Sequence, residues 1–325
     1  MSRIRIFRWI VALVVIVVLP RAVPARAWGG GSGGVTALAI DPRNPGTIYA
    51  ATSSAGSPWG TVCKSADGGT SWQTTGLIRA NISVLAIDSS TPTTLYAGTD
   101  SGVVKSTDGG ASWHATTLTY NISSLAINPL TPTTIYAGRA WDISGQAWSG
   151  LFESTDGGGS SGELLDSFVP FLAIDPVTPT TLYGAGYSGV IKTSDGGANW
   201  ATPTWNSFTG AILALAVDPV TRTTVYAGTD VICCDEYSGA VLAPGGIFKS
   251  TDGGTTWQTL VLFDVLTAFA LAINPLTTTT VVLTWLRVDS SRGVSPLTTT
   301  FSVPVASRRV SVRLISAPTF TTTFF

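Results

Sequence analysis

One short phrase, Leu-Ala-Ile/Val-Asp/Asn, occurs six times in the 325 residues at spacings of 40 to 56, and it constrains the fold more than any other feature. Its copies begin at Leu38, Leu85, Leu125, Leu172, Leu215 and Leu271. A second phrase, Thr-x-Tyr-Ala/Gly, follows the first five copies and contains Tyr49, Tyr96, Tyr136, Tyr183 and Tyr226. Each unit holds four short strand-like runs, here named A to D, separated by Pro, Asn, Asp or Gly turns. Four antiparallel strands at this period are typical of one propeller blade.

A third phrase, Ser/Thr-x-Asp-Gly-Gly-x-Ser/Thr/Asn-Trp, lies where strand C turns into strand D, and we call it the box. Four copies are complete or nearly so, and a fifth, at 154–161, has lost its Trp. A β-solenoid has shorter rungs, and α-repeats need a helical periodicity that is absent here. We therefore predict an all-β fold, a β-propeller of about six to seven four-stranded blades over residues 35–285, with the last blade imperfect.

The three phrases together resemble the Asp-box (bacterial neuraminidase repeat) proteins over about residues 35–280. That group includes sialidases, xyloglucan-degrading glycosidases, the sortilin luminal domain and photosystem II assembly factors. Because its members do unrelated things, the resemblance implies the propeller fold but no particular activity.

The repeated box residues are predicted to be structural. Two glycines allow positive φ in a tight turn, the acid accepts backbone N–H bonds, and the indole packs between sheets. One active site cannot need a copy of the same acid in every blade. This interpretation covers Asp67, Asp108, Asp156, Asp195 and Asp252, together with Trp72, Trp113, Trp200 and Trp257. The four lysines also share one repeat position, and we expect them on the solvated side of strand C.

The N-terminal residues precede the repeats and have a different sequence pattern. Three arginines precede an unbroken apolar run from Trp9 to Leu19, and Ala25-Arg26-Ala27 matches a small-x-small cleavage site. Residues 1–27 are therefore predicted to be a secretory signal peptide, because the run is too short to span a bilayer as a helix, and residues 28–34 a Gly-rich linker. We expect a secreted or extracytoplasmic protein with no membrane span after cleavage.

Composition excludes several functions. The net charge is −1 and only 11% of residues are charged, so no basic surface exists to bind nucleic acid. A single histidine, His114, and three cysteines, Cys63, Cys233 and Cys234, give too few ligands for a structural metal. We expect no metal and no cofactor. The odd cysteine count leaves at least one thiol free or paired between molecules.

Candidate functional residues are those that depart from the repeat. In a four-stranded meander the A–B and C–D turns share one face (the box face), while the B–C and D–A connections share the other (the loop face). Three B–C loops are enlarged, at 53–60, 139–150 and 230–246. Aromatic faces beside carboxylates suit sugars. The candidate ligand-binding residues are Trp59, Trp141, Trp148, Asp235, Glu236 and Tyr237.

Two functions remain open. The first is a non-enzymatic binding or scaffold module for a polysaccharide or an envelope protein; its loops can also be simple solvated loops. The second is a glycoside hydrolase with Asp142 and Asp235 (or Asp230) as its paired acids. The resemblance favours a xyloglucanase-like over a sialidase-like site, because the arginine triad of sialidases has no counterpart here.

The C-terminal part breaks the pattern. After Asn274-Pro275 neither the tyrosine phrase nor the box recurs, and threonine runs appear at 277–280, 298–300 and 321–323. Residues 286–325 are predicted to be a degenerate tail that can supply part of the closing blade. A frame error, truncation or decay at the end of blade six is the hypothesis that explains it.

Overall fold

The computed structural model describes residues 35–54, 57–139, 150–167, 169–186, 189–201, 211–230, 244–263, 266–273, 280–289, 293–302 and 311–314. All regular structure in these ranges is β-strand, arranged in six antiparallel sheets. Five of the sheets run A-B-C-D in sequence order, as a propeller blade does, and the fourth runs A-B-C. The predicted signal peptide and linker, residues 1–34, lie outside the described ranges.

The first three blades are complete. Blade 1 consists of β1 (Val35–Ile40), β2 (Ile48–Ser54), β3 (Ser57–Ser65) and β4 (Gln73–Ala80). Blade 2 consists of β5 (Ile82–Ile87), β6 (Leu95–Thr99), β7 (Gly102–Ser106) and β8 (His114–Ala115). Blade 3 consists of β9 (Ile122–Ile127), β10 (Ile135–Arg139), β11 (Leu151–Ser154) and β12 (Gly162–Leu165).

Blades 4 to 6 follow the same plan. Blade 4 has β13 (Phe171–Ile174), β14 (Leu182–Gly186) and β15 (Gly189–Thr193), with a single bridge from Lys192 to Ala201 at its outer edge. Blade 5 has β16 (Ile212–Val217), β17 (Val225–Thr229), β18 (Gly245–Ser250) and β19 (Gln258–Phe263). Blade 6 has β20 (Leu266–Ile273), β21 (Thr280–Asp289), β22 (Gly293–Ser302) and β23 (Ser311–Leu314).

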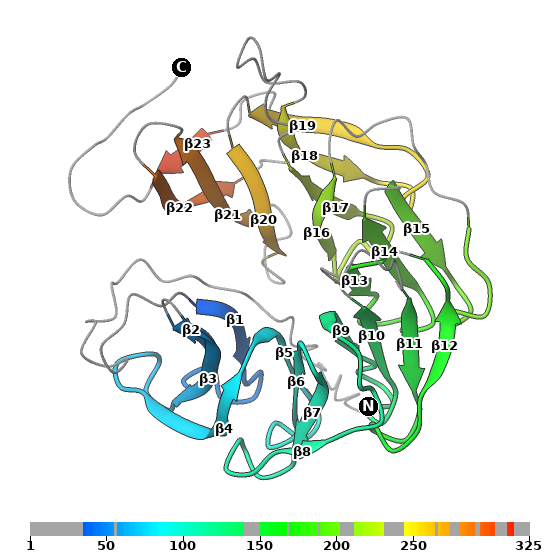
Figure 1. Cartoon of the computed structure of the whole chain (residues 1–325). Coiled ribbons are helices and arrows are strands. Elements are labelled where there is room, and N and C mark those ends of the chain that lie inside the picture. Colours follow the sequence, from blue (N-terminus) through cyan, green and yellow to red (C-terminus); the bar gives the residue numbers. More distant parts are fainter. Residues whose placement is uncertain are drawn as a thin grey trace, which may run out of the picture.

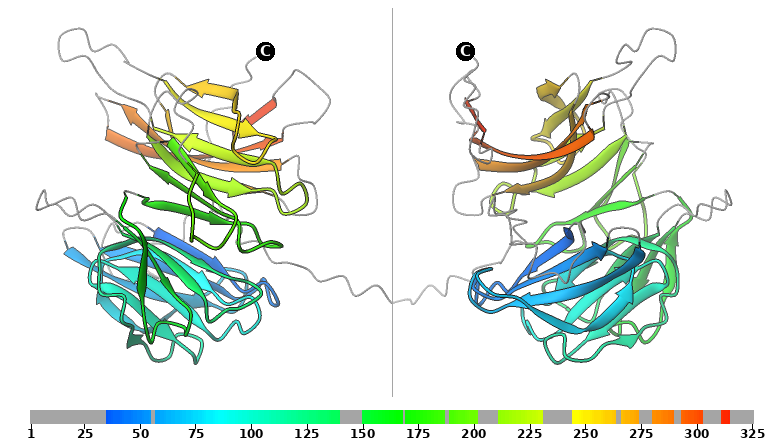
Figure 2. Two further views of the ribbon diagram at one scale, coloured as in Figure 1. Left: turned by 90° about the vertical axis from the view of Figure 1, so that its right-hand side faces the viewer. Right: turned by 60° about the vertical axis from the view of Figure 1, so that its left-hand side comes forward.

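The blades follow one another around an arc (Figure 1). The A strands of successive blades pack together in order: β1 contacts β5, β5 contacts β9, and so on to β16 against β20. Blades 1 and 6 stand at the two ends of this arc, and Figure 2 shows the stack of sheets from the side. The chain is a β-propeller, as its repeat predicted.

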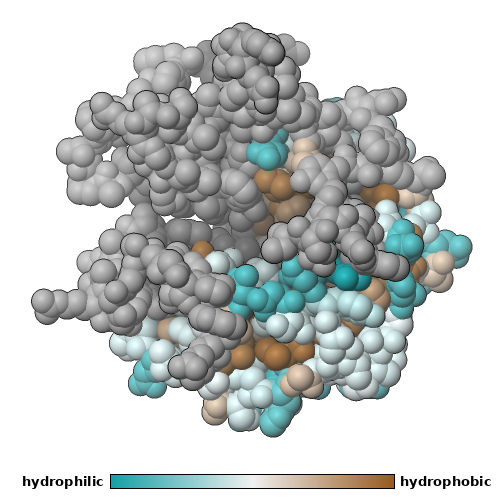
Figure 3. Space-filling model, in the orientation of Figure 1, coloured by the Kyte–Doolittle hydropathy of each residue, from teal (hydrophilic) through white to brown (hydrophobic). Residues whose placement is uncertain are grey.

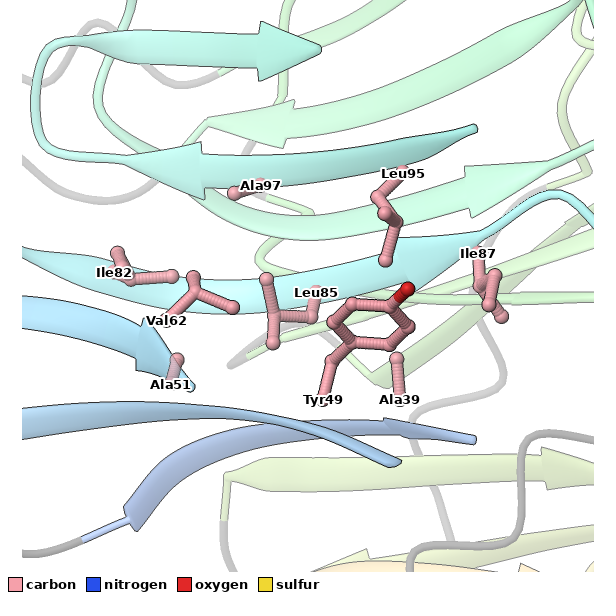
Figure 4. Packing of buried hydrophobic residues seen from close by; sticks show 9 residues of the cluster. All are labelled: Ala39, Tyr49, Ala51, Val62, Ile82, Leu85, Ile87, Leu95 and Ala97. Carbon is pink, nitrogen blue, oxygen red and sulfur yellow. The ribbon is translucent and has the colours of Figure 1, made fainter. Parts of the chain in front are cut away.

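The core lies between neighbouring blades. Between blades 1 and 2, Tyr49 and Val62 of one blade pack against Ile82, Leu85 and Leu95 of the next (Figure 4). The B strands of blades 2, 4 and 5 are buried along their whole length, because each is covered on both faces by adjacent blades. Their small residues allow this close approach: a Cβ added to Gly98 would stand 2.6 Å from Val84 Cγ1 and 2.8 Å from Ile122 Cγ2.

The threonine-rich tail takes part in the sixth sheet. The predicted domain end at residue 285 falls within β21. β22 pairs with β21, and β23 pairs with β22, both in regular antiparallel register. The backbone beyond residue 285 therefore supplies the C and D strands of blade 6, although the sequence there lacks the box.

Candidate functional site

The five box acids bind their own turns. Asp67 accepts hydrogen bonds from the Ser71 backbone N–H (2.8 Å), the Ser71 hydroxyl (2.6 Å) and the Ser65 hydroxyl (2.7 Å). The box serine in turn accepts the N–H of the second glycine, as Ser65 does from Gly69 at 2.8 Å. Asp108, Asp156, Asp195 and Asp252 bond the equivalent residues of their own boxes. Both box glycines have positive φ in every copy, for example 72° and 93° at Gly109 and Gly110.

These bonds fix the charge state of the acids. Hydrogen bonds from the Ser71 hydroxyl and N–H, then from the Ser65 hydroxyl, lower the pKa of Asp67 from 3.8 to about 2. The pKa values of Asp156, Asp195 and Asp252 are likewise lowered to about 2, and that of Asp108 is lowered too, each by its own box. A general acid must hold a proton near the working pH. The box acids are ionised and separated one per blade, so they do not form a catalytic pair.

The box tryptophans also close their own turns. The indole N–H groups of Trp72, Trp113 and Trp257 donate to the carbonyl of the second box glycine at 3.0–3.1 Å. Only Trp257 is buried; Trp72, Trp113 and Trp200 are half-buried. The expected burial between sheets is therefore partial, because each ring lies across the box turn at the edge of its blade. Within the described part of the chain Trp200 Nε1 is buried with no hydrogen-bond partner.

The A–B and C–D turns of a blade lie together on the box face, as the meander predicted. In each of the first five blades the first box glycine, or its equivalent, donates its N–H to the A–B turn of the same blade, as Gly109 does to Thr93 at 2.9 Å. The A–B turn is itself held by its acid: Asp88 accepts the N–H groups of Ser90 and Thr91. The repeated acids of both turns therefore serve the scaffold.

A lysine and a tyrosine of one blade form hydrogen bonds to the box of the next blade. Lys105 Nζ donates to the Gly157 carbonyl at 3.1 Å and lies 5.4 Å from the centroid of the Tyr96 ring. The Tyr96 hydroxyl donates to the same carbonyl at 3.5 Å. We call this arrangement the clasp; Lys64, Tyr49 and Gly109 form it between blades 1 and 2.

The lysines were expected on a solvated strand face, and that prediction was wrong. All four are half-buried, because each ammonium group lies over the tyrosine ring of its own blade. Lys64 and Lys105 also donate to a box carbonyl of the next blade. In blade 3 the lysine position holds Glu153. Burial, then the charge of Glu153 and a hydrogen bond to it, raise the pKa of Tyr136 to about 12.

Of the three cysteines, the structure describes one, Cys63. Cys63 is buried and free, and burial raises the pKa of its thiol to about 11, which makes it a poor nucleophile. Cys233 and Cys234 lie outside the described residues. Among the residues that the structure describes, no group of three or more His, Cys, Asp or Glu side chains could hold a metal ion. The same residues include no helix long and apolar enough to cross a membrane.

Most sequence-predicted ligand residues lie outside the described ranges. These are Trp141, Asp142, Trp148, Asp235, Glu236 and Tyr237. Trp59, expected in an enlarged loop, lies on strand β3, because the hairpin continues to the pair Ser54 and Ser57. Of the acids proposed for a hydrolase, Asp230 is described: it directly follows β17 in blade 5, where its N–H donates to the Ala211 carbonyl at 2.8 Å.

The structure adds one cluster that the sequence did not single out as a site. At the base of the blade 3 loop, the Arg139 guanidinium lies 4.8 Å from the centroid of the Tyr120 ring. Tyr120 in turn stacks on Phe152, with ring centroids 4.4 Å apart. The available signal was that Arg139 and Tyr120 both depart from the repeat.

Known structures share this fold. A GH74 enzyme from Niastella koreensis superposes with a TM-score of 0.66 at 24% identity, covering 86% of this chain and 46% of that one. The GH74 xyloglucanase from Xanthomonas campestris gives 0.59 at 17% identity, covering 86% and 51%. Sqt1 from Saccharomyces cerevisiae gives 0.52 at 11% identity, covering 87% and 93%.

The chain thus spans about half the length of these two GH74 proteins. No family model matches the sequence. No curated protein matches it at a significant level either. At these identities the likeness establishes the propeller fold.

Proposed function

We propose that the chain is an exported, non-enzymatic binding module whose ligand, a polysaccharide, binds on the loop face. The observation that supports this most directly is that the repeated acids are all engaged in structural hydrogen bonds. Every box acid is bonded to its own turn on the box face. The residues free to vary therefore gather at the opposite ends of the strands, where the enlarged loops carry tryptophans and acids.

The chemistry of these loops suits sugars better than other ligands. Trp141 and Trp148 both lie in the loop 139–150, which has one acid, and the blade 5 loop has Asp235, Glu236 and Tyr237 in a row. Aromatic rings stack on the apolar faces of sugars, while carboxylates accept hydrogen bonds from their hydroxyls. The predicted signal peptide supports a setting in which polysaccharides are the abundant ligands.

The test is a binding panel of soluble polysaccharides with the purified chain, read by affinity electrophoresis. A Trp141→Ala/Trp148→Ala variant should lose about 10-fold or more in affinity, because truncation of an aromatic residue that anchors a ligand costs more than about 1 kcal/mol. Trp72→Phe, on the box face, serves as the control and should bind normally. Absence of binding to any polysaccharide would count against the proposal and in favour of a protein partner.

A glycoside hydrolase is the second candidate, favoured by the likeness to GH74 enzymes. It requires two carboxyl groups roughly 5–10 Å apart, one as acid and one as base or nucleophile. Reducing ends released from xyloglucan measure this activity directly. Asp142→Asn and Asp235→Asn should abolish release if the chain is a hydrolase. A binding module should show no release in any variant.

A further inference from the structure

At the strand B position three residues after the repeated tyrosine, blade 3 differs from blades 1, 2 and 5. This position is threonine in blades 1, 2 and 5, and its hydroxyl closes the B–C hairpin. Thr99 donates to the Gly102 carbonyl at 2.8 Å, and Thr229 accepts the Gly246 N–H at 2.9 Å. In blade 3 the residue is Arg139, whose backbone N–H donates to the Gly150 carbonyl at 2.9 Å. The backbone thus closes the hairpin and leaves the side chain for another use.

The arginine is held by a second departure in the same blade. Two residues before the strand A isoleucine, blade 2 has Ala80 and blade 5 has Gly210, whereas blade 3 has Tyr120. The Tyr120 ring supports the guanidinium at 4.8 Å on one side and stacks on the buried Phe152 ring at an interplanar angle of 20°. This three-layer stack fixes the position of the charge, so little side-chain freedom is lost when a ligand binds.

Among the described residues, the Arg139 guanidinium has no carboxylate partner. Its contacts within the described residues are aromatic, and its buried Nε has no hydrogen-bond partner there. An atom buried to this degree is closed to a ligand as well as to water, so only the terminal Nη groups of Arg139 can meet a ligand. The guanidinium is planar and presents parallel N–H groups, which match the two oxygens of a carboxylate.

We infer that Arg139, seated on Tyr120, is a subsite for a carboxylate-bearing sugar, and that the polysaccharide ligand contains uronic acid. This inference rests on the proposed function, since it names the chemical class of the same ligand. The position agrees with it, because Arg139 ends β10 where the loop containing Trp141 and Trp148 begins. A net charge of −1 gives the chain no general attraction for polyanions, so binding of an acidic polysaccharide must be local. In the view of Figure 3, the apolar residues of the described surface lie in separate patches among hydrophilic ones.

The experiment compares polygalacturonate with neutral xyloglucan on the full chain. Arg139→Thr restores the residue of blades 1, 2 and 5, so the variant should fold. It should weaken polygalacturonate binding about 10- to 100-fold and leave xyloglucan binding unchanged. The polygalacturonate affinity of Arg139→Lys should lie between those of the wild type and Arg139→Thr, because lysine keeps the charge but lacks the planar guanidinium with its paired N–H groups. Arg43→Thr removes the same charge from an exposed turn on the box face and should bind like wild type.

Each other outcome overturns the inference. If xyloglucan binds and polygalacturonate does not, the carboxylate subsite is wrong but the proposed function stands; if neither binds, both fail. If Arg43→Thr weakens binding as much as Arg139→Thr, net charge and not a subsite is responsible. If dextran sulfate binds as tightly as polygalacturonate, the site does not select carboxylate. Should Arg139→Thr fail to fold, Arg139→Gln, which keeps the length of the stem, takes its place.

Discussion

Blades 2 and 3 are built from the same repeat, yet they differ at three positions where the repeat has a clear structural role. Blade 2 has Lys105 in its clasp, where blade 3 has Glu153. Blade 2 closes its box with Trp113, where blade 3 has Ser161. Blade 2 ends strand B with Thr99, where blade 3 has Arg139.

Two of these differences lie near the box face of the propeller, and the third lies on the loop face. Near the box face, Glu153 replaces the lysine of the clasp and bonds the Tyr136 hydroxyl of its own blade instead, while Ser161 removes the indole that closes the other boxes. Arg139 replaces one hairpin bond and acquires an aromatic support on the loop face. Blade 3 therefore retains the box and its glycines, while it has lost part of its junction and gained a charged group above it. The predictions below test this contrast.

The largest effect is expected from the glycine that begins strand C. Gly102 in blade 2 has φ 132°, and a Cβ there would stand 2.3 Å from the Leu118 carbonyl oxygen, whereas at Gly150 in blade 3 it would meet only side chains, at 3.1 Å or more. Gly102→Ala should cost about 3 kcal/mol of unfolding free energy, and Gly150→Ala less than about 1 kcal/mol. Guanidinium chloride denaturation measures both. Equal losses in the two blades would contradict the comparison.

A clasp can be restored in blade 3. Glu153→Lys should let Nζ reach the next box and the Tyr136 ring, stabilising the protein by about 1 kcal/mol. The variant also removes the negative charge that helps to raise the pKa of Tyr136 to about 12, so the pKa should fall. Ultraviolet absorbance of the phenolate follows this titration. Glu153→Gln, the control, should lower the pKa without adding stability; an unchanged titration in both variants would show that Glu153 does not act on Tyr136.

A smaller gain is expected from Ser161→Trp. The other boxes place an indole N–H on the second glycine carbonyl, which in blade 3 belongs to Gly158. The new ring should add about 0.5 kcal/mol or slightly more. Ser161→Phe provides the ring without the donor and should add less. A loss of stability with Trp would mean that blade 3 has repacked around the missing ring.

The smallest effect concerns the box acids, because they are exposed. The pKa of Asp156 is lowered from 3.8 to about 2 in the folded state, so its bonds stabilise the fold above pH 3.8 and are lost as the pH falls through about 2. Asp156→Asn should flatten the dependence of stability on pH in this window. Asp108→Asn should do the same, since both boxes make the same bonds; a change confined to one blade would show that the boxes are not equivalent.

Local sequence was enough to predict much of the scaffold. The glycine pairs, box acids and tyrosines recur in register, and the turns they form need only residues a few positions apart. The clasp was not predictable in this way. Lys105 and Gly157 are 52 residues apart, and only the stacking of blades brings them together. The prediction for the lysines was wrong for this reason. Tyr120 was overlooked because it precedes β9, whereas its partner Arg139 lies at the end of β10.

The repeat by itself determined that this chain folds into radially arranged four-stranded sheets, because each phrase specifies a hairpin through hydrogen bonds within its own turn. Only the tertiary structure decided which residues meet between blades. It placed the lysines on tyrosine rings, the Arg139 charge on Tyr120, and the threonine-rich tail in the sixth sheet. Contacts across a blade junction depend on how two sheets pack, and a pattern within one strand does not encode that distance.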